Sequence, residues 1–338
     1  MKALFISLLL FIGFGSFVLW SANQPIGGKG SMLFNIAKGD SVARIAERLQ
    51  DAGLIRSAAV FRLTAWSRGD RSAFKAGSFE LSPGMTVREM EAVLADAKPI
   101  SNEVAITTIE GWTLDDIAGY LSKQGLTTTQ AFAAQAGSSA AQGEKLPDWN
   151  ASFSILNDKP AGANLEGYLF PDTYRVYPNG NVSEIVRRML ADMDAKFTPA
   201  MRADAAKHGR SVFQILTMAS VLEREVRTDA DRKMVADLFW RRVDTKHGME
   251  ADSTVNYCTG KSLASVSHAD TKVECPWNTY KYRGLPVGPI GNPGLASIEA
   301  AIGPTPNDYW YFLTDKQGNV HYGKTLDEHN ANKRKYLK

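Results

Sequence analysis

The sequence lacks most of the short motifs by which enzymes are recognised. It contains no G-x-S-x-G turn, no Walker-type phosphate loop, no H-E-x-x-H pair and no G-x-G-x-x-G fingerprint. Its five histidines show no metal-ligand spacing. We therefore expect neither a metal nor a cofactor. Acyl transfer also finds little support, because Ser253 has no histidine–aspartate signature near it.

The chain also lacks a marked excess of charge of one sign. It has 39 Lys and Arg against 36 Asp and Glu in 338 residues, a formal charge of +3. It has no basic block and no interleaving of basic with aromatic residues, so nucleic acid is not expected as a partner. The hydrophobic content of 44% is ordinary, and the length allows one membrane segment and two or three domains.

A long uncharged run is present at the N-terminus. Residues 3–20 carry no charge and follow Lys2. As a helix this run is just long enough to span the hydrocarbon core of a membrane. The positive charge before it predicts a single-pass anchor over residues 1–22, with the N-terminus in the cytoplasm and the remaining chain outside. A cleaved signal peptide is the alternative, although residues 21–23 match a cleavage site poorly.

The two cysteines, Cys258 and Cys275, lie in the part of the chain expected outside the cytoplasm. No C-x-x-C spacing or histidine cluster accompanies them, which argues against a metal site. An even pair seventeen positions apart in an oxidising compartment is expected to form a disulfide.

A strand–turn–helix pattern repeats after a Pro/Gly-rich linker at residues 23–31. Each copy has a short strand, a Gly turn, a Ser or Thr that can cap the next helix, and one apolar helical face. The strands are expected at 33–36, 79–81 and 104–109, and the third copy covers 104–126. We expect small β-α modules over 32–100 and a larger domain over 101–338.

The first copy contains residues 39–46 (GDSVARIA), which resemble half of a LysM module, the small βααβ domain that holds N-acetylglucosamine polymers. The resemblance implies LysM-like modules that contact glycan. The alternative is a recurrent way of starting a helix after a strand, without a binding role.

We expect an α+β fold for the larger domain. The expected fold class of the whole chain is α+β, with an N-terminal transmembrane helix. Beyond a loop at residues 138–150, helices are expected at 182–197, 211–227 and 229–243. A hairpin is expected at 309–314 and 319–322, followed by a short helix.

The helix expected over 211–227 carries the most informative carboxyl group. On a wheel of 100° per residue, Glu223 lies within the apolar stripe beside Leu216, whereas Glu225 lies about 160° away. A carboxyl group that faces an apolar wall is costly to ionise, so its pKa rises and it remains a proton donor near neutral pH. The alternative is a buried structural Glu satisfied by Arg227.

Several motifs in fixed order resemble the YceG-like family of endolytic transglycosylases, also called MltG. Residues 219–225 (ASVLERE) are similar to the A-S-[IV]-[IVL]-E-[KR]-E signature of that family. The others are 165–174 (LEGYLFPDTY), 252–255 (DSTV), 278–280 (NTY) with 284–290 (GLPVGPI), and 292–294 (NPG). Two departures are Val287, where Pro is usual, and the cysteine-bearing stretch between Tyr257 and Pro276.

The resemblance implies that the protein cleaves the β-1,4 bond between N-acetylmuramic acid and N-acetylglucosamine in nascent peptidoglycan and leaves 1,6-anhydro ends. Glu223 takes the position of the family's catalytic residue. The other motif residues would line the cleft and bind substrate: Glu166, Tyr168, Asp252, Ser253, Thr254, Asn256, Asn278, Thr279, Tyr280 and Pro286. The expected location is the bacterial inner membrane, held through residues 3–20, with the catalytic part in the periplasm. Peptidoglycan synthases are candidate partners.

Two other functions stay open at this stage. The first is a muramidase that hydrolyses the same bond with water, using Glu166 or Asp252 as a second carboxylate. The second is a wall-binding scaffold that holds glycan without cutting it. The mass of the product separates the first from a lytic transglycosylase, because an anhydro end is lighter by one water molecule.

Overall fold

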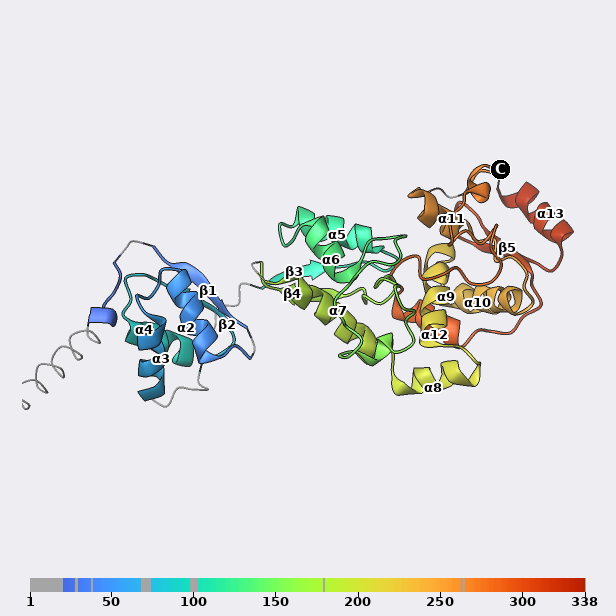
Figure 1. The fold of residues 1–338 in the computed structure, drawn as a ribbon. Coiled ribbons are helices and arrows are strands. Elements are labelled where there is room, and N and C mark those ends of the chain that lie inside the picture. Colours follow the sequence, from blue (N-terminus) through green and yellow to red (C-terminus); the bar gives the residue numbers. More distant parts are fainter. Residues whose placement is uncertain are drawn as a thin grey trace, which may run out of the picture. The chain divides into compact units, whose positions relative to one another are not determined.

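The computed structural model describes residues 21–27, 30–37, 39–67, 74–97, 103–178, 180–261, 263 and 265–337. The chain forms two compact units, Met1–Glu103 and Val104–Lys338 (Figure 1). The anchor expected at residues 3–20 lies outside the described residues. Within the described ranges, no helix is both long enough and apolar enough to cross a membrane.

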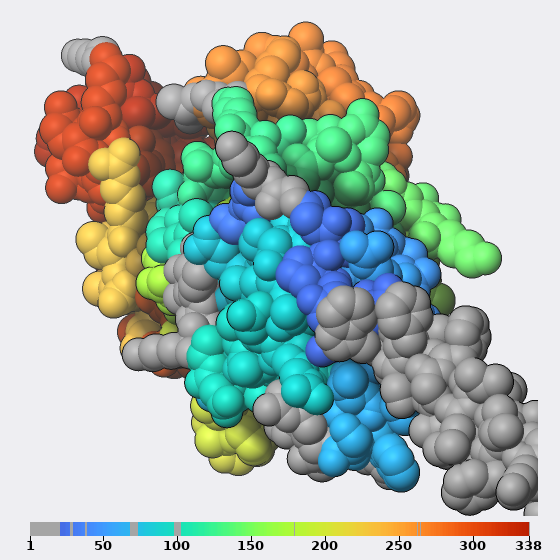
Figure 2. All heavy atoms as spheres, turned by 90° about the vertical axis from the view of Figure 1, so that its left-hand side faces the viewer, coloured from blue at the N-terminus to red at the C-terminus, as the bar shows by residue number. Residues whose placement is uncertain are grey.

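The first unit has the order strand–helix–helix–strand–helix, and Figure 2 draws its surface in blue to cyan. Its elements are β1 (Met32–Ile36), α2 (Val42–Asp51), α3 (Ala58–Ser67), β2 (Gly77–Leu81) and α4 (Val87–Asp96). The two strands are antiparallel, with Phe34 opposite Phe79. Leu49, Phe61 and Met90 pack beneath them and are fully buried. The first two strand–turn–helix copies therefore share one small core.

The second unit is a mixture of helices and small antiparallel sheets, so the expected α+β character is confirmed. β3 pairs with β4, and β5 pairs with β6. Its elements are β3 (Val104–Thr107), α5 (Leu114–Lys123), α6 (Thr129–Ala136), η1 (Ser154–Leu156), β4 (Thr173–Val176), α7 (Val182–Lys196), α8 (Pro199–Lys207), α9 (Val212–Glu225), α10 (Asp229–Asp244), α11 (Asp252–Thr259), η2 (Asp270–Lys272), α12 (Leu295–Ile302), β5 (Tyr311–Thr314), β6 (Val320–Gly323) and α13 (Leu326–Tyr336).

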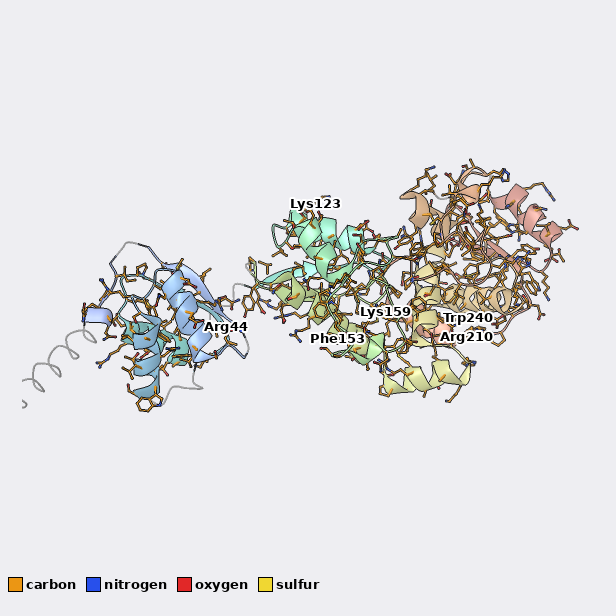
Figure 3. All side chains as sticks on the ribbon, in the orientation of Figure 1. Arg44, Lys123, Phe153, Lys159, Arg210 and Trp240 are labelled. Carbon is orange, nitrogen blue, oxygen red and sulfur yellow. A yellow bond between two sulfur atoms is a disulfide. The ribbon has the colours of Figure 1, made fainter. Side chains whose placement is uncertain are left out.

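Helix α9 lies at the centre of this unit, beside α10 and α12 (Figure 1). Ser211 caps its N-terminus and forms a capping box with Gln214. Every residue from Ile215 to Leu222 is buried, as is usual for a helix enclosed on all sides. Before its start, the guanidinium of Arg210 lies 4.0 Å from the ring centre of Trp240 on α10 (Figure 3).

The third strand is shorter than the sequence predicted. It was expected over 104–109 but ends at Thr107, and residues 108–113 form a turn that leads into α5. The backbone N–H of Thr108 still donates to Asp172 O (3.1 Å), which lies opposite it in the register, so the pairing ends at Thr108 and the chain turns away from Ile109 onward. The residues of this turn are therefore free to face α9 rather than the sheet.

Candidate active site

Asn292 joins three segments that are far apart in the sequence: the turn at 108–113, the segment at 164–170 and the loop at 286–294. Its backbone N–H donates to Trp112 O (2.8 Å), and its carbonyl oxygen accepts from Gly111 N–H (2.8 Å). Its side-chain oxygen accepts from Leu169 N–H (2.9 Å), while its amide nitrogen donates to Trp112 O (2.9 Å). Because Asn292 is buried, these bonds fix the turn and the loop against each other.

Glycine is needed on both sides of this contact, for two different reasons. A Cβ atom on Gly291 would lie 2.7 Å from Gly111 O, which is closer than real side chains come to a carbonyl oxygen. Gly111 itself has φ +79°, a conformation that residues with a side chain rarely adopt. The Gly turn that marks the repeat in the sequence thus serves a tertiary contact here.

Glu223 projects from the last turn of α9 into this junction. Its Oε1 accepts from Arg232 Nη2 of α10 (3.0 Å), and its Oε2 accepts from the backbone N–H of Gly294 (2.9 Å). Only 6% of its side chain is exposed. The expected apolar wall is therefore replaced by a cation and an amide donor, and the alternative partner Arg227 is not the one that contacts it.

Glu110 is a second carboxyl group at the same junction, and the sequence analysis did not single it out. It occupies the space that a Cβ atom on Gly294 would need, so Glu110 and Glu223 approach the same residue. Partial burial raises the pKa of Glu110, and the charge of Glu223 raises it further, while Arg232 lowers it. A signal was present in the repeat: the residue before the turn glycine is Lys38 in the first copy and Pro83 in the second, but Glu in the third.

Glu166 is buried behind the junction and accepts hydrogen bonds from four donors. They are Leu114 N–H (3.1 Å), Ser139 Oγ (3.1 Å), Tyr257 Oη (2.9 Å) and Asn292 Nδ2 (3.3 Å). Burial raises its pKa to about 8, against the lowering effect of these bonds. Through these hydrogen bonds Glu166 connects α5, α11 and the 286–294 loop.

The predicted residues of the 252–257 and 278–280 motifs form a polar layer on the other side of α9. Thr254 and Thr279 are buried, with their hydroxyl oxygens 2.9 Å apart. Tyr280 is partly exposed and donates to Asp252 Oδ1 (2.6 Å). The backbone N–H of Ser253 donates to Glu225 Oε1 (3.3 Å). Glu225 thus has partners different from those of Glu223, and burial raises its pKa.

The remaining predicted residues also lie within the framework of this region. Asn256 Nδ2 donates to Leu263 O (2.7 Å), and Asn278 Nδ2 donates to Val273 O (2.8 Å), so both amides shape the loop that follows α11. A disulfide between Cys258 and Cys275 closes this loop, with Cα atoms 6.0 Å apart. Tyr168 and Pro286 are buried. Substrate contact by these residues stays a prediction.

A pocket of about 240 Å³ lies away from Glu223, in the 144–165 region. Trp149 and Lys159 contribute to its lining, and Lys159 is labelled in Figure 3. The Nζ atom of Lys159 donates to Ala163 O (2.6 Å), and burial lowers the pKa of the amine. Neither Glu110 nor Glu223 lines this pocket, so it does not mark the carboxyl pair.

Comparisons with known proteins bear on the family suggested by these motifs. The sequence model of the YceG-like family matches residues 34–335. The chain belongs to the YceG-like family. The resemblance predicted from the motifs is therefore confirmed.

Two relatives of this YceG-like chain are named endolytic murein transglycosylase. The one from Bacillus subtilis is 33% identical over 318 residues, which cover 91% of this chain and 86% of the relative. The one from Streptococcus pneumoniae serotype 2 is 31% identical, and the match covers 98% of this chain but 64% of the longer relative. A yceG-like protein of Listeria monocytogenes with a known crystal structure is 31% identical, with a TM-score of 0.57 over 90% of this chain and 99% of that one.

Proposed function

We propose that this protein is a peptidoglycan lytic transglycosylase in which Glu223 is a catalytic carboxyl group. Membership of the YceG-like family and the two relatives named endolytic murein transglycosylase support the activity and the substrate class. The observation that carries the choice of residue is that Glu223, in the 219–225 motif, accepts from the backbone N–H of Gly294, in the 292–294 motif. Glu223 lies where the 108–113 turn and the 286–294 loop meet, with a cation on one oxygen and an amide on the other.

The reaction would cut the bond between N-acetylmuramic acid and N-acetylglucosamine without water. A carboxyl proton moves to the glycosidic oxygen as the bond to the muramic acid breaks. The electron pair of that bond leaves with the oxygen, and positive charge develops on the sugar carbon. The C6 hydroxyl of the same muramic acid then attacks this carbon and returns its proton to the carboxylate. Because the nucleophile belongs to the substrate, no carboxylate is needed to activate water.

The same proposal extends to the first unit and to the N-terminus. The order β1–α2–α3–β2 supports a LysM-like module, since it reproduces the βααβ order implied by residues 39–46. We propose that this unit holds glycan while the second unit cuts it. The uncharged run at residues 3–20 supports an anchor in the inner membrane with the catalytic unit in the periplasm, where peptidoglycan and its synthases lie.

Mass spectrometry of isolated peptidoglycan digested with the full chain tests the function. We expect internal cuts that leave 1,6-anhydro-muramic ends. Products heavier by one water molecule would instead identify a muramidase. Binding without any new chain ends, unchanged in the Glu223→Gln variant, would identify a scaffold.

A further inference from the structure

The two carboxyl groups at the junction differ in how a glycan strand could reach them. Glu223 has 6% of its side chain exposed, and each of its oxygens is already bonded to the protein. Glu110 is an exposed residue of the turn at 108–113, but its carboxyl group is partly buried against Gly294, whose backbone N–H binds Glu223. An incoming strand therefore meets Glu110 before it meets Glu223.

The charges at the junction do not balance when every carboxyl group is ionised. Arg232 donates to Asp229 through Nη1 (2.8 Å) and to Glu223 through Nη2 (3.0 Å), so one guanidinium already faces two carboxylates. The side chain of Arg224 is directed to Ile290 O (3.3 Å) instead. Among the described residues, the charges that act on Glu110 are Glu223 from α9 and Arg232 and Asp229 from α10, so a third carboxylate would be uncompensated.

We propose that Glu110 is a second catalytic carboxyl group and that Glu110 and Glu223 together hold the single proton of the reaction. Two carboxyl groups that repel each other retain one proton to a higher pH than either would alone, and the proton belongs to the pair. The proposal rests on the glycan-cleaving function and deepens it. The pair gives its proton to the leaving oxygen as the glycosidic bond breaks, and takes one back from the C6 hydroxyl as the anhydro bond forms. No water and no net proton are consumed.

The direction of the pKa shift at Glu110 agrees with this arrangement, since both burial and the charge of Glu223 favour its protonated form. In Glu110→Gln the repulsion is absent, and Glu223 keeps Arg232 and the Gly294 amide as its neighbours. Without this repulsion the acid form is lost at a lower pH than in the pair, so the alkaline limb of the pH–rate profile moves to lower pH.

The first experiment measures turnover of uncrosslinked peptidoglycan by the full chain between pH 4 and 9. We expect Glu110→Gln to lower kcat at neutral pH by about 10- to 100-fold and to shift the alkaline limb by about one pH unit or more. Glu110→Asp should recover part of the rate. Glu223→Gln should lose turnover by a factor on the order of 10² to 10⁴ across the whole range. Asp204→Asn, which removes an exposed carboxylate on α8, should behave as the wild type.

A second experiment displaces the Glu110 carboxyl group without removing its charge. Gly294 has φ −77°, which alanine adopts without strain, but the new Cβ atom would take the place of the Glu110 carboxyl group. We expect Gly294→Ala to lower kcat by about tenfold in the wild type and less than twofold in a Glu110→Ala background, because coupled residues give non-additive effects. The backbone N–H that binds Glu223 is retained in both.

The outcomes separate this proposal from the function on which it rests. A wild type that releases no anhydro ends would overturn the function. An active wild type with a folded Glu110→Gln variant of unchanged rate and pH profile would overturn the role of Glu110 and leave the function intact. A uniform loss of rate at every pH, together with a lower Tm, would show that Glu110 acts only on folding and would also reject the proposal.

Discussion

The second and third copies of the strand–turn–helix pattern contain nearly the same turn in two different settings. Thr86 caps α4, and its backbone N–H donates to Glu89 Oε2 (2.7 Å). Thr113 caps α5, and its backbone N–H donates to Asp116 Oδ2 (3.0 Å). Both are capping boxes, built from local sequence alone. In each copy the helix begins where the sequence predicts it.

The two turns differ in what they contact outside the copy. In the second copy, Ser82 Oγ binds Gly30 O (2.8 Å), so the turn only fastens the linker. In the third copy, Asn292 binds Gly111 and Trp112, and Glu110 reaches the residue that binds Glu223. Local sequence thus builds the turn, whereas a partner from a distant segment makes it part of a site.

The largest expected effect comes from Glu223, which lies against the turn of the third copy. Glu223→Gln keeps the shape of the side chain but cannot donate a carboxyl proton, so we expect turnover to fall by a factor on the order of 10² to 10⁴. Steady-state rates of anhydro-end release measure it. Glu225→Gln is the matched control on the same helix and should stay within about tenfold, because an amide oxygen can still accept from Ser253 N–H. Equal losses in the two variants would contradict the assignment.

The next largest effect is expected at Asn292, which joins the turn at 108–113 to the loop at 286–294. Asn292→Ala leaves the buried N–H of Leu169 without its acceptor and removes the amide donor to Trp112. Because a buried polar group without a partner is costly, we expect the free energy of unfolding to fall by about 1 to 3 kcal/mol. Denaturant unfolding measures it. Asn150→Ala, at an exposed asparagine, should change stability by less than about 0.5 kcal/mol.

The smallest expected effect comes from removing the capping hydroxyl of Thr86 or of Thr113. Thr86→Ala and Thr113→Ala each remove one capping hydroxyl, so each should destabilise its own unit by about 1 kcal/mol. Only Thr113→Ala should also lower turnover, because its helix follows the turn that carries Glu110. Thermal unfolding and product release, measured side by side, test the difference. If Thr86→Ala lowered turnover equally, the distinction between the two turns would be lost.

The elements that local patterns specify were predicted well from the sequence. The helices expected at 182–197, 211–227 and 229–243 are found within two residues of those bounds, because each has a capping residue and a continuous apolar pattern. The hairpin expected at 309–314 and 319–322 is found as β5 (Tyr311–Thr314) and β6 (Val320–Gly323), because its strand pattern is also local. Helix α12 was not among the helices expected from the sequence, because Gly294 before it provides no capping side chain.

The environment of Glu223 could not be predicted, because it depends on other elements. The helical wheel placed Glu223 on the apolar stripe of α9, and α9 is indeed buried. Its carboxyl group nevertheless contacts Arg232 of α10 and an amide before α12, nine and seventy-one positions away. A wheel describes the neighbours on one helix and contains no information on groups that other helices bring to it.

The hydrogen bond between Asn292 and Trp112 spans 180 positions of the chain. During synthesis and folding, contacts across such distances form after local helices and turns, because closing a long loop costs chain entropy. The junction around Glu223 therefore cannot assemble until the C-terminal part of the chain has arrived. A chain truncated before residue 292 can form α9 and its capped neighbours and still lack the junction around Glu223. On the proposed role of Glu223, cleavage of the cell wall would begin only once the chain is nearly whole.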